Sequence, residues 1–239
     1  MLETLDSVLS AIDKVLWGPF ILIPLLLGTG LYLTIRLGGI QLTKLFQALR
    51  LAFFTRKDEG AQGGDISQFQ ALTTAMAATV GTGNIVGVAT AIGTGGPGSL
   101  FWMWITAIFG MASKYSEAFL AVRFRTTDAK GEISGGPQYY LQRGIRGGFG
   151  KFLALFFCVA AIIASFGIGN TTQGNSISVN MVDSFHVPEW ITGLVLAVLT
   201  LLVLVGGIKS IGRVTSNLVP IMIVFYVVGA IYILCVNVG

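Results

Sequence analysis

Residues 66–96 read ISQFQALTTAMAATVGTGNIVGVATAIGTGG, and this stretch contains no Asp, Glu, Lys, Arg or His. A helix needs about 20 apolar residues to cross roughly 30 Å of hydrocarbon. The stretch is therefore about ten residues longer than a plain transmembrane helix requires. The excess length predicts a membrane span that contains a break.

The glycines of this stretch place the break. Residues 66–80 contain no glycine, and Gly81 and Gly83 follow directly. Each glycine costs roughly 1 kcal/mol in a helix interior, so the pair makes unwinding easy. We expect one half-helix up to about Val80, an unwound Gly81-Thr82-Gly83 segment, and a second half-helix from about Asn84.

A break at mid-membrane forms a binding site for small ions and ligands. The first half-helix ends in free carbonyls, which suit a cation, and the second begins with free N–H groups, which suit a carboxylate. Thr79, Thr82 and Asn84 surround the break, and the Asn84 amide offers an oxygen to a sodium ion. A glycine-rich packing seam with interhelical hydrogen bonds is the alternative, and spacing alone leaves both interpretations open.

The composition is that of a polytopic membrane protein. The 239 residues are 54% hydrophobic and 11% charged, with a mean hydropathy of +0.79, whereas a soluble domain carries about 25% charged residues. No hydrolase triad, zinc-protease motif or metal-ligand cluster is visible, so we expect neither an enzyme nor a nucleic-acid partner. Gly-x-Gly-Asn occurs at 81–84 and 167–170, but no strand precedes either copy, which argues against a nucleotide-binding loop.

Apolar runs predict six membrane spans separated by turns and charged connections. The spans are 18–37, a broken span at about 66–95, 99–122, 152–179, 190–207 and 214–236. Residues 40–57 are basic and amphipathic and predict an interfacial helix followed by a loop. Residues 137–141 predict the start of a short surface helix.

The charged residues predict the orientation in the membrane. The connections 36–57, 123–151 and 209–213 hold thirteen of the fifteen Lys and Arg residues, whereas residues 1–16 and the loop 181–190 are net acidic. By the positive-inside rule the basic connections are cytoplasmic. We therefore expect a multi-pass protein of the plasma membrane or cell inner membrane with its N-terminus outside.

Two further groups of residues are candidates for function. Phe166, Asn170 and Gln173 fall on one face of the fourth span, where Phe166 would form an apolar wall and Gln173 a polar contact for a substrate. Polar packing between helices is the alternative for this face. Lys114 and Glu117 lie three residues apart near the inner end of the third span, and a local ion pair is favoured over a proton relay.

Four stretches resemble those of a known family. They are GDISQFQALTTAMAATVGTGNIVGVATAI (64–92), GGPGSLFWMWITAIFGMASKYSEAFLAVRFR (95–125), GGPQYYL (135–141) and FGIGNTTQGNSIS (166–178). They resemble the alanine/glycine:cation symporters, also called sodium:alanine symporters. The block 95–104 is the most specific, and the resemblance extends from about Trp17 to the end of the chain.

The resemblance implies an all-α polytopic fold similar to that of bacterial leucine transporters. That fold consists of two inverted five-helix repeats, which in this family follow an extra first helix. Residues 1–64 would then be an extracellular N-terminus, the first transmembrane helix and a cytoplasmic amphipathic segment, and residues 65–239 the first repeat. Because family members are roughly twice this length, the resemblance also implies a missing C-terminal half, and we expect the 239-residue chain alone not to transport.

The resemblance also implies a set of ligands at the break. The backbone amides of Thr82 and Gly83 would hold the substrate carboxylate, and Phe166, Asn170 and Gln173 would lie on a helix that faces the substrate. Oxygen atoms around the end of the first half-helix would hold sodium: the Thr79 carbonyl and Asn84 side chain at one site, and the Ala77 and Val80 carbonyls at a second.

The function implied is secondary active transport, in which a small neutral amino acid, alanine or glycine, is imported with a sodium ion by alternating access. A proton-coupled amino-acid transporter of the same fold is one alternative. A non-transporting half-protein that needs a partner is another.

Overall fold

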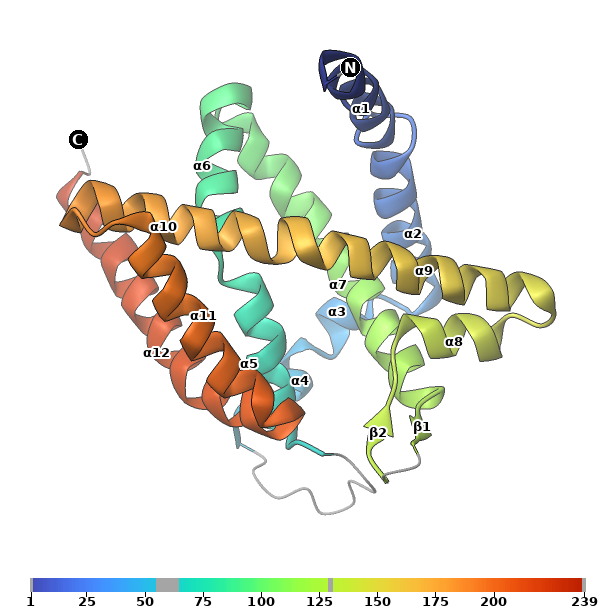
Figure 1. Ribbon diagram of the computed structural model, residues 1–239. Helices are drawn as coiled ribbons and strands as arrows, with labels where there is room; N and C mark the ends of the chain where they lie inside the picture. Colours follow the sequence, from blue (N-terminus) through green and yellow to red (C-terminus); the bar gives the residue numbers. More distant parts are fainter. Residues whose placement is uncertain (1, 55–64, 129–130, 238–239) are drawn as a thin grey trace.

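The computed structural model describes residues 2–54, 65–128 and 131–237, and Figure 1 shows a molecule built almost entirely of helices. The elements are α1 (Leu2–Leu16), α2 (Leu22–Arg36), α3 (Ile40–Thr43), α4 (Leu45–Phe54), α5 (Gln68–Thr79), α6 (Thr82–Gly95), α7 (Gly98–Arg123), β1 (Thr126–Thr127), β2 (Ile133–Ser134), α8 (Pro137–Gly144), α9 (Gly148–Phe166), a π-helical turn (Gly167–Thr171), α10 (Thr172–Phe185), α11 (Glu189–Val205) and α12 (Gly207–Val236). The strands form one short antiparallel hairpin.

Three helical segments of the described chain are long and apolar enough to cross a membrane. They are Gln68–Gly95 with 28 residues, Gly148–Phe185 with 38 and Gly207–Val236 with 30. The helices α2 and α11 are apolar but shorter. The helix α7 has 26 residues, but Lys114 and Glu117 in its second half reduce its apolar character. The chain is thus a multi-pass, α-helical membrane protein, while the six-span count, its orientation, the inverted repeat and the division near residue 64 stay predictions.

Several predicted boundaries differ from those of the structure. The fourth span, predicted at 152–179, is part of a helical segment that runs from 148 to 185. The predicted connection 209–213 lies inside α12, because the turn is completed earlier, at Gly206 and Gly207, where Gly207 has a φ of 64°. Residues 40–54 form two helices that meet at Lys44, and residues 55–57 of the predicted interfacial segment lie outside the described residues. The predicted surface helix is confirmed as α8, which begins at Pro137.

The N-terminal residues were expected only to be acidic, but they form the helix α1. Apolar residues recur in them at positions 2, 5, 8, 9, 12, 15 and 16. This spacing is typical of an amphipathic helix, so the sequence contained the signal.

The helices α5 and α12 pack closely although they are far apart in the sequence. The hydroxyl groups of Thr74 on α5 and Thr215 on α12 lie 3.0 Å apart and form a hydrogen bond. A Cβ atom at Gly212 would lie 3.1 Å from Ile66 and 3.3 Å from Gln70. Small residues and interhelical hydrogen bonds are the usual means of helix association in membranes, and here they hold the first half of the broken span against α12.

The solvent-accessible surface is large for a chain of this mass. The structure exposes 18235 Å², whereas a folded soluble monomer of 25.3 kDa would expose about 10,000 Å². Among the described residues the buried hydrophobic side chains are those of Ala112, Ala154 and Val219. Most of the apolar surface must therefore be covered by lipid or by other protein.

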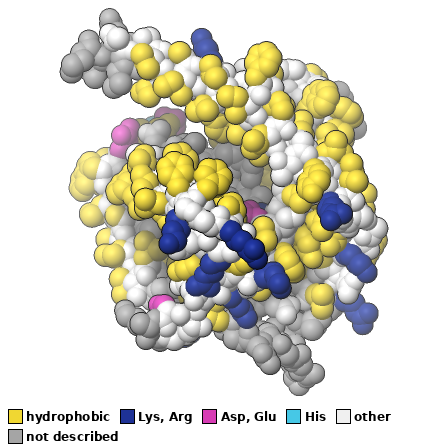
Figure 2. All heavy atoms as spheres, turned by 90° about the vertical axis from the view of Figure 1, so that its right-hand side faces the viewer, with side chains coloured by type: hydrophobic (Ala, Val, Ile, Leu, Met, Phe, Trp, Pro, Cys, Tyr) yellow, Lys and Arg dark blue, Asp and Glu magenta, His cyan; other side chains and the backbone are white. Residues whose placement is uncertain are grey.

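Charged side chains are not spread evenly over this surface. Figure 2 shows the face that forms the right-hand side of Figure 1, and most of the Lys and Arg side chains visible there lie in its lower half. Hydrophobic side chains occupy most of the upper half, and Asp and Glu are few. This segregation agrees with the basic connections gathering at one end of the helices.

We expect a Gly30→Ala substitution to destabilise the packing of α2 on α7. A Cβ atom at Gly30 would lie 2.8 Å from both the Cβ atom and the carbonyl oxygen of Phe109, so the helices would have to separate, at a cost of about 1–3 kcal/mol. Gly28→Ala on the same helix is the matched control, because a Cβ atom there meets nothing within 4 Å. Thermal unfolding in detergent should show a lower Tm for Gly30→Ala alone, and equal Tm values for both variants would contradict the contact.

Candidate functional site

The first half of the broken span, α5, has a well-defined start. The backbone N–H of Gln70 donates to the Ser67 hydroxyl at 3.2 Å, and the Ser67 N–H donates to the Gln70 side chain at 3.0 Å. This reciprocal capping box satisfies two N–H groups that the first helical turn leaves free. It fixes the start of α5, a helix of 12 residues that ends at Thr79.

The break between α5 and α6 consists of Val80 and Gly81. Val80 has φ −86° and ψ 86°, and Gly81 is fully extended with φ −153° and ψ −179°. The Gly81 carbonyl then accepts hydrogen bonds from the N–H groups of Asn84 and Ile85 at 3.1 and 3.2 Å. A break in a 28-residue apolar segment is confirmed, and Figure 1 shows the change of direction between the two halves.

The break is narrower than predicted. Thr82 and Gly83, which were expected to be unwound, form the first turn of α6, because the Gly81 carbonyl already closes that turn. The N–H groups of a first helical turn have no acceptor within their own helix. The amides of Thr82 and Gly83 therefore lie at the positive end of the α6 dipole, where an anionic group is favoured.

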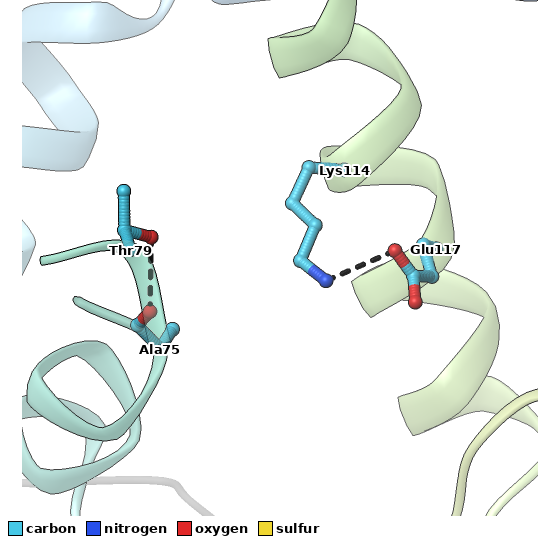
Figure 3. A network of polar contacts seen from close by, with 4 residues as sticks. All are labelled: Ala75, Thr79, Lys114 and Glu117. Atoms are coloured by element: carbon cyan, nitrogen blue, oxygen red, sulfur yellow. Dashed lines mark hydrogen bonds and ion pairs between the residues drawn. The ribbon is translucent and has the colours of Figure 1, made fainter. Parts of the chain in front are cut away.

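The Asn84 side chain reaches back across the break. Its Nδ2 group donates a hydrogen bond to the Thr79 carbonyl at the end of α5. The Thr79 hydroxyl donates to the Ala75 carbonyl within its own helix at 3.1 Å, as Figure 3 shows, which leaves the Thr79 carbonyl as the group that faces Asn84. Two of the four sodium ligands predicted from the resemblance are thus in direct contact.

The other two predicted sodium ligands are backbone carbonyls of the same helix end. Ala77 lies in the last turn of α5, and Val80 directly follows the helix, with its N–H donating to the Met76 carbonyl at 2.8 Å. Within the described ranges no group of three or more His, Cys, Asp or Glu side chains is placed to hold a metal. Carbonyl and amide oxygens of this kind suit a hard cation.

Gln173 of α10 comes to the same break from a distant part of the chain. The Thr82 hydroxyl donates to the Gln173 Oε1 atom at 2.7 Å. A Cβ atom placed on Gly81 would lie 3.6 Å from the Gln173 Nε2 atom, an ordinary van der Waals contact, so the Gln173 amide lies close to the extended backbone of Gly81. The predicted substrate residue Gln173 and the predicted carboxylate-binding residue Thr82 are brought together.

Phe166 and Asn170 are placed differently from Gln173. Residues 167–171 form a π-helical turn, which interrupts the regular α-helical spacing that put all three residues on one face. The Phe166 side chain is 78% exposed, and Asn170 is exposed as well. Among the described residues, residues 166–173 are joined to the break by the hydrogen bond from Thr82 to Gln173.

The π-helical turn is the feature of the site that the sequence analysis missed. The Thr171 hydroxyl donates to the Phe166 and Gly167 carbonyls at 2.6 and 2.8 Å, at the start of the irregular turn. The signal for it was the sequence Gly-Ile-Gly-Asn-Thr, because two closely spaced glycines weaken a helix here as they do at the break.

Lys114 and Glu117 form the local ion pair that was favoured over a proton relay. The Lys114 Nζ atom lies 3.0 Å from the Glu117 Oε2 atom, and the two side chains are 71% and 44% exposed. Figure 3 shows that the pair belongs to α7 and lies apart from Thr79 on α5.

Burial raises the pKa of Tyr140 on α8 above its ordinary value, and the nearby Glu117 carboxylate raises this pKa further.

The chain was compared with known proteins. The model of the sodium:alanine symporter family matches residues 2–239. The sodium/alanine symporter AgcS of Methanococcus maripaludis is 52% identical over 234 residues, which are 98% of this chain and 51% of AgcS. The amino-acid carrier protein AlsT of Bacillus subtilis is 39% identical over 215 residues, which are 90% of this chain and 44% of AlsT.

A third relative differs in its named substrate. The probable sodium/glutamine symporter GlnT of Bacillus subtilis is 36% identical over 242 residues, which are 100% of this chain and 48% of GlnT. The chain spans about half the length of the curated relatives that it matches. Because the match and these identities extend over nearly the whole chain, the chain belongs to the sodium:alanine symporter family.

Proposed function

We propose that this chain takes part in secondary active transport, in which a small neutral amino acid, alanine or glycine, is imported together with sodium by alternating access. The observation that carries the proposal is the convergence of four predicted ligands at one break. Asn84 contacts the Thr79 carbonyl on one side, and Thr82 contacts Gln173 on the other. Membership of the family and the names of AgcS and GlnT support sodium as the coupling ion.

The substrate carboxylate would bind at the start of α6. The amides of Thr82 and Gly83 point away from their own helix and carry the positive end of its dipole. Bonds to a charged carboxylate are roughly twice as strong as bonds between neutral groups. Because Gln173 accepts the Thr82 hydroxyl through Oε1, its Nε2 donors are not used in that bond and would approach the same carboxylate.

The sodium ion would bind at the end of α5. The Thr79 carbonyl and the Asn84 amide already lie against each other, and rotation of the amide would turn its oxygen, in place of its nitrogen, toward a cation beside that carbonyl. The Ala77 and Val80 carbonyls would contribute to a second cation site at the same helix end. Substrate and ion would thus bind on the two sides of Gly81, so that each favours the same arrangement of the half-helices, which is the basis of coupling.

The test is uptake of labelled alanine into liposomes that contain the full-length gene product. Uptake should be fast with an inward sodium gradient and fall to background when potassium replaces sodium. Uptake that follows a proton gradient and ignores sodium would instead support proton coupling with the same fold. Absence of amino-acid uptake in a folded protein under either gradient would overturn the transport proposal.

A Gln173→Leu substitution is expected to weaken amino-acid binding without removing the dependence on sodium. Loss of one hydrogen bond to a charged group costs about 1.5–3 kcal/mol, which corresponds to a rise of about 10- to 100-fold in the alanine concentration for half-maximal uptake. Gln142→Leu on the exposed surface of α8 is the matched control. An unchanged alanine dependence in Gln173→Leu would remove this residue from the substrate site.

A further inference from the structure

The N-terminal helix α1 has an apolar face that no other helix covers. Its exposed apolar side chains lie on one side, each between 49% and 60% exposed: Val8, Leu9, Ile12, Val15 and Leu16. Polar side chains occupy the opposite side at helical spacing: Asp6, Ser7, Ser10, Asp13 and Lys14. Within the described residues α1 makes no extensive contact with another helix, so the apolar face requires a partner from outside these residues.

The connection to α2 holds α1 at the surface of the bilayer. Only residues 17–21 separate the two helices, and five extended residues reach at most about 18 Å. In Figure 1 α1 lies at one end of α2 and is seen nearly along its axis, whereas α2 runs down the page. The axis of α1 is therefore roughly perpendicular to that of α2. If α2 crosses the membrane, α1 lies close to the membrane plane.

The side chains around this connection are typical of a membrane interface. Trp17 is 64% exposed and Phe20 is 90% exposed, and aromatic residues gather at the boundary between hydrocarbon and water. Exposed apolar side chains also occur in α2, where Ile23 and Leu25 are 48% and 62% exposed. Exposed apolar side chains are thus found along α1, the connection and the start of α2.

We propose that α1 is an interfacial helix that lies in the headgroup layer with Leu9 and Ile12 turned into the acyl boundary and Ser7 and Ser10 turned to water. A helix of this kind buries its apolar face about 5–10 Å into the boundary. Its described polar face carries two acidic residues against one lysine, so it has no electrostatic attraction to anionic lipids. The partner is therefore a zwitterionic lipid surface.

The test uses single cysteines on the two faces of α1. Cys158 and Cys235 are first replaced by Ala, and the variants Leu9→Cys, Ile12→Cys, Ser7→Cys and Ser10→Cys are labelled with a nitroxide in phosphatidylcholine vesicles. Relaxation of each label by oxygen, which concentrates in lipid, is compared with relaxation by a water-soluble nickel chelate. Leu25→Cys on α2 is the reference for a lipid-facing position.

We expect oxygen to dominate at positions 9 and 12, as at position 25, and the nickel chelate to dominate at positions 7 and 10. Equal relaxation by the nickel chelate of the labels on both faces would show that α1 lies in water and would overturn the proposal. Labels at 9 and 12 that are shielded from both reagents would overturn it as well, because protein, such as a second copy of the chain, would then cover the face. The readout needs no transport, so its failure is distinguishable from failure of the proposed function.

Discussion

An Asn84→Ala variant is expected to lose sodium-driven uptake at sodium concentrations that saturate the parent protein. The variant keeps the Thr79 carbonyl but removes the amide that lies against it across the break. Loss of one polar contact to a charged group costs about 1.5–3 kcal/mol, as for a hydrogen bond to an ion, so the sodium concentration for half-maximal uptake should rise by about 10- to 100-fold. Uptake of labelled alanine, measured over a range of sodium concentrations, gives the sodium concentration for half-maximal uptake.

The matched control for this experiment is Asn180→Ala. Asn180 is an exposed asparagine on α10 whose Nδ2 group donates to the Ser176 carbonyl of its own helix at 2.8 Å, so its loss removes an equivalent amide away from the break. Asn180→Ala should show the sodium dependence of the parent protein. A sodium dependence in Asn84→Ala that matches this control would remove Asn84 from the cation site.

A Gly83→Leu variant is expected to abolish amino-acid binding while the protein stays folded. A Cβ atom at Gly83 meets nothing within 4 Å, and leucine is a better helix former than glycine, so the substitution does not disturb α6. The larger side chain would fill the space in front of the Thr82 and Gly83 amides. Loss of two bonds to the carboxylate corresponds to a fall in affinity of about 100-fold or more.

Gly93→Leu tests whether this loss is specific to the start of α6. Gly93 lies on the same helix, ten residues further along, and a Cβ atom there also meets nothing within 4 Å. Equilibrium binding of labelled alanine in detergent should be normal in Gly93→Leu and undetectable in Gly83→Leu, with similar thermal unfolding of both. Normal alanine binding to Gly83→Leu would show that the carboxylate does not bind at these amides.

The position of the candidate site was predictable because its causes are local. The absence of charge from 66 to 96 places the segment in the membrane, and glycine at 81 and 83 weakens the helix at one point. The width of the break was not predictable. It depends on whether the Gly81 carbonyl closes the next turn, and in the structure its bonds to Asn84 and Ile85 do so.

The fourth span shows the corresponding limit for residues on a shared face. Regular α-helical spacing predicts that Phe166, Asn170 and Gln173 point the same way. That spacing holds only if the helix is regular, and the π-helical turn at 167–171 changes it. Glycine spacing can mark such a turn, but it does not give the number of residues that the turn takes up, which the structure shows to be five.

The sequence by itself determined the membrane character of the chain, the positions of most helices, the break near Gly81 and the amphipathic spacing of α1, since hydropathy, glycine cost and helical period all act within a few residues. Only the tertiary structure decided which distant groups meet. Thr82 and Gln173 are 91 residues apart in the sequence, and Thr74 and Thr215 are 141 apart. These pairs form because helices approach closely where small residues permit it, and that approach depends on the packing of whole helices.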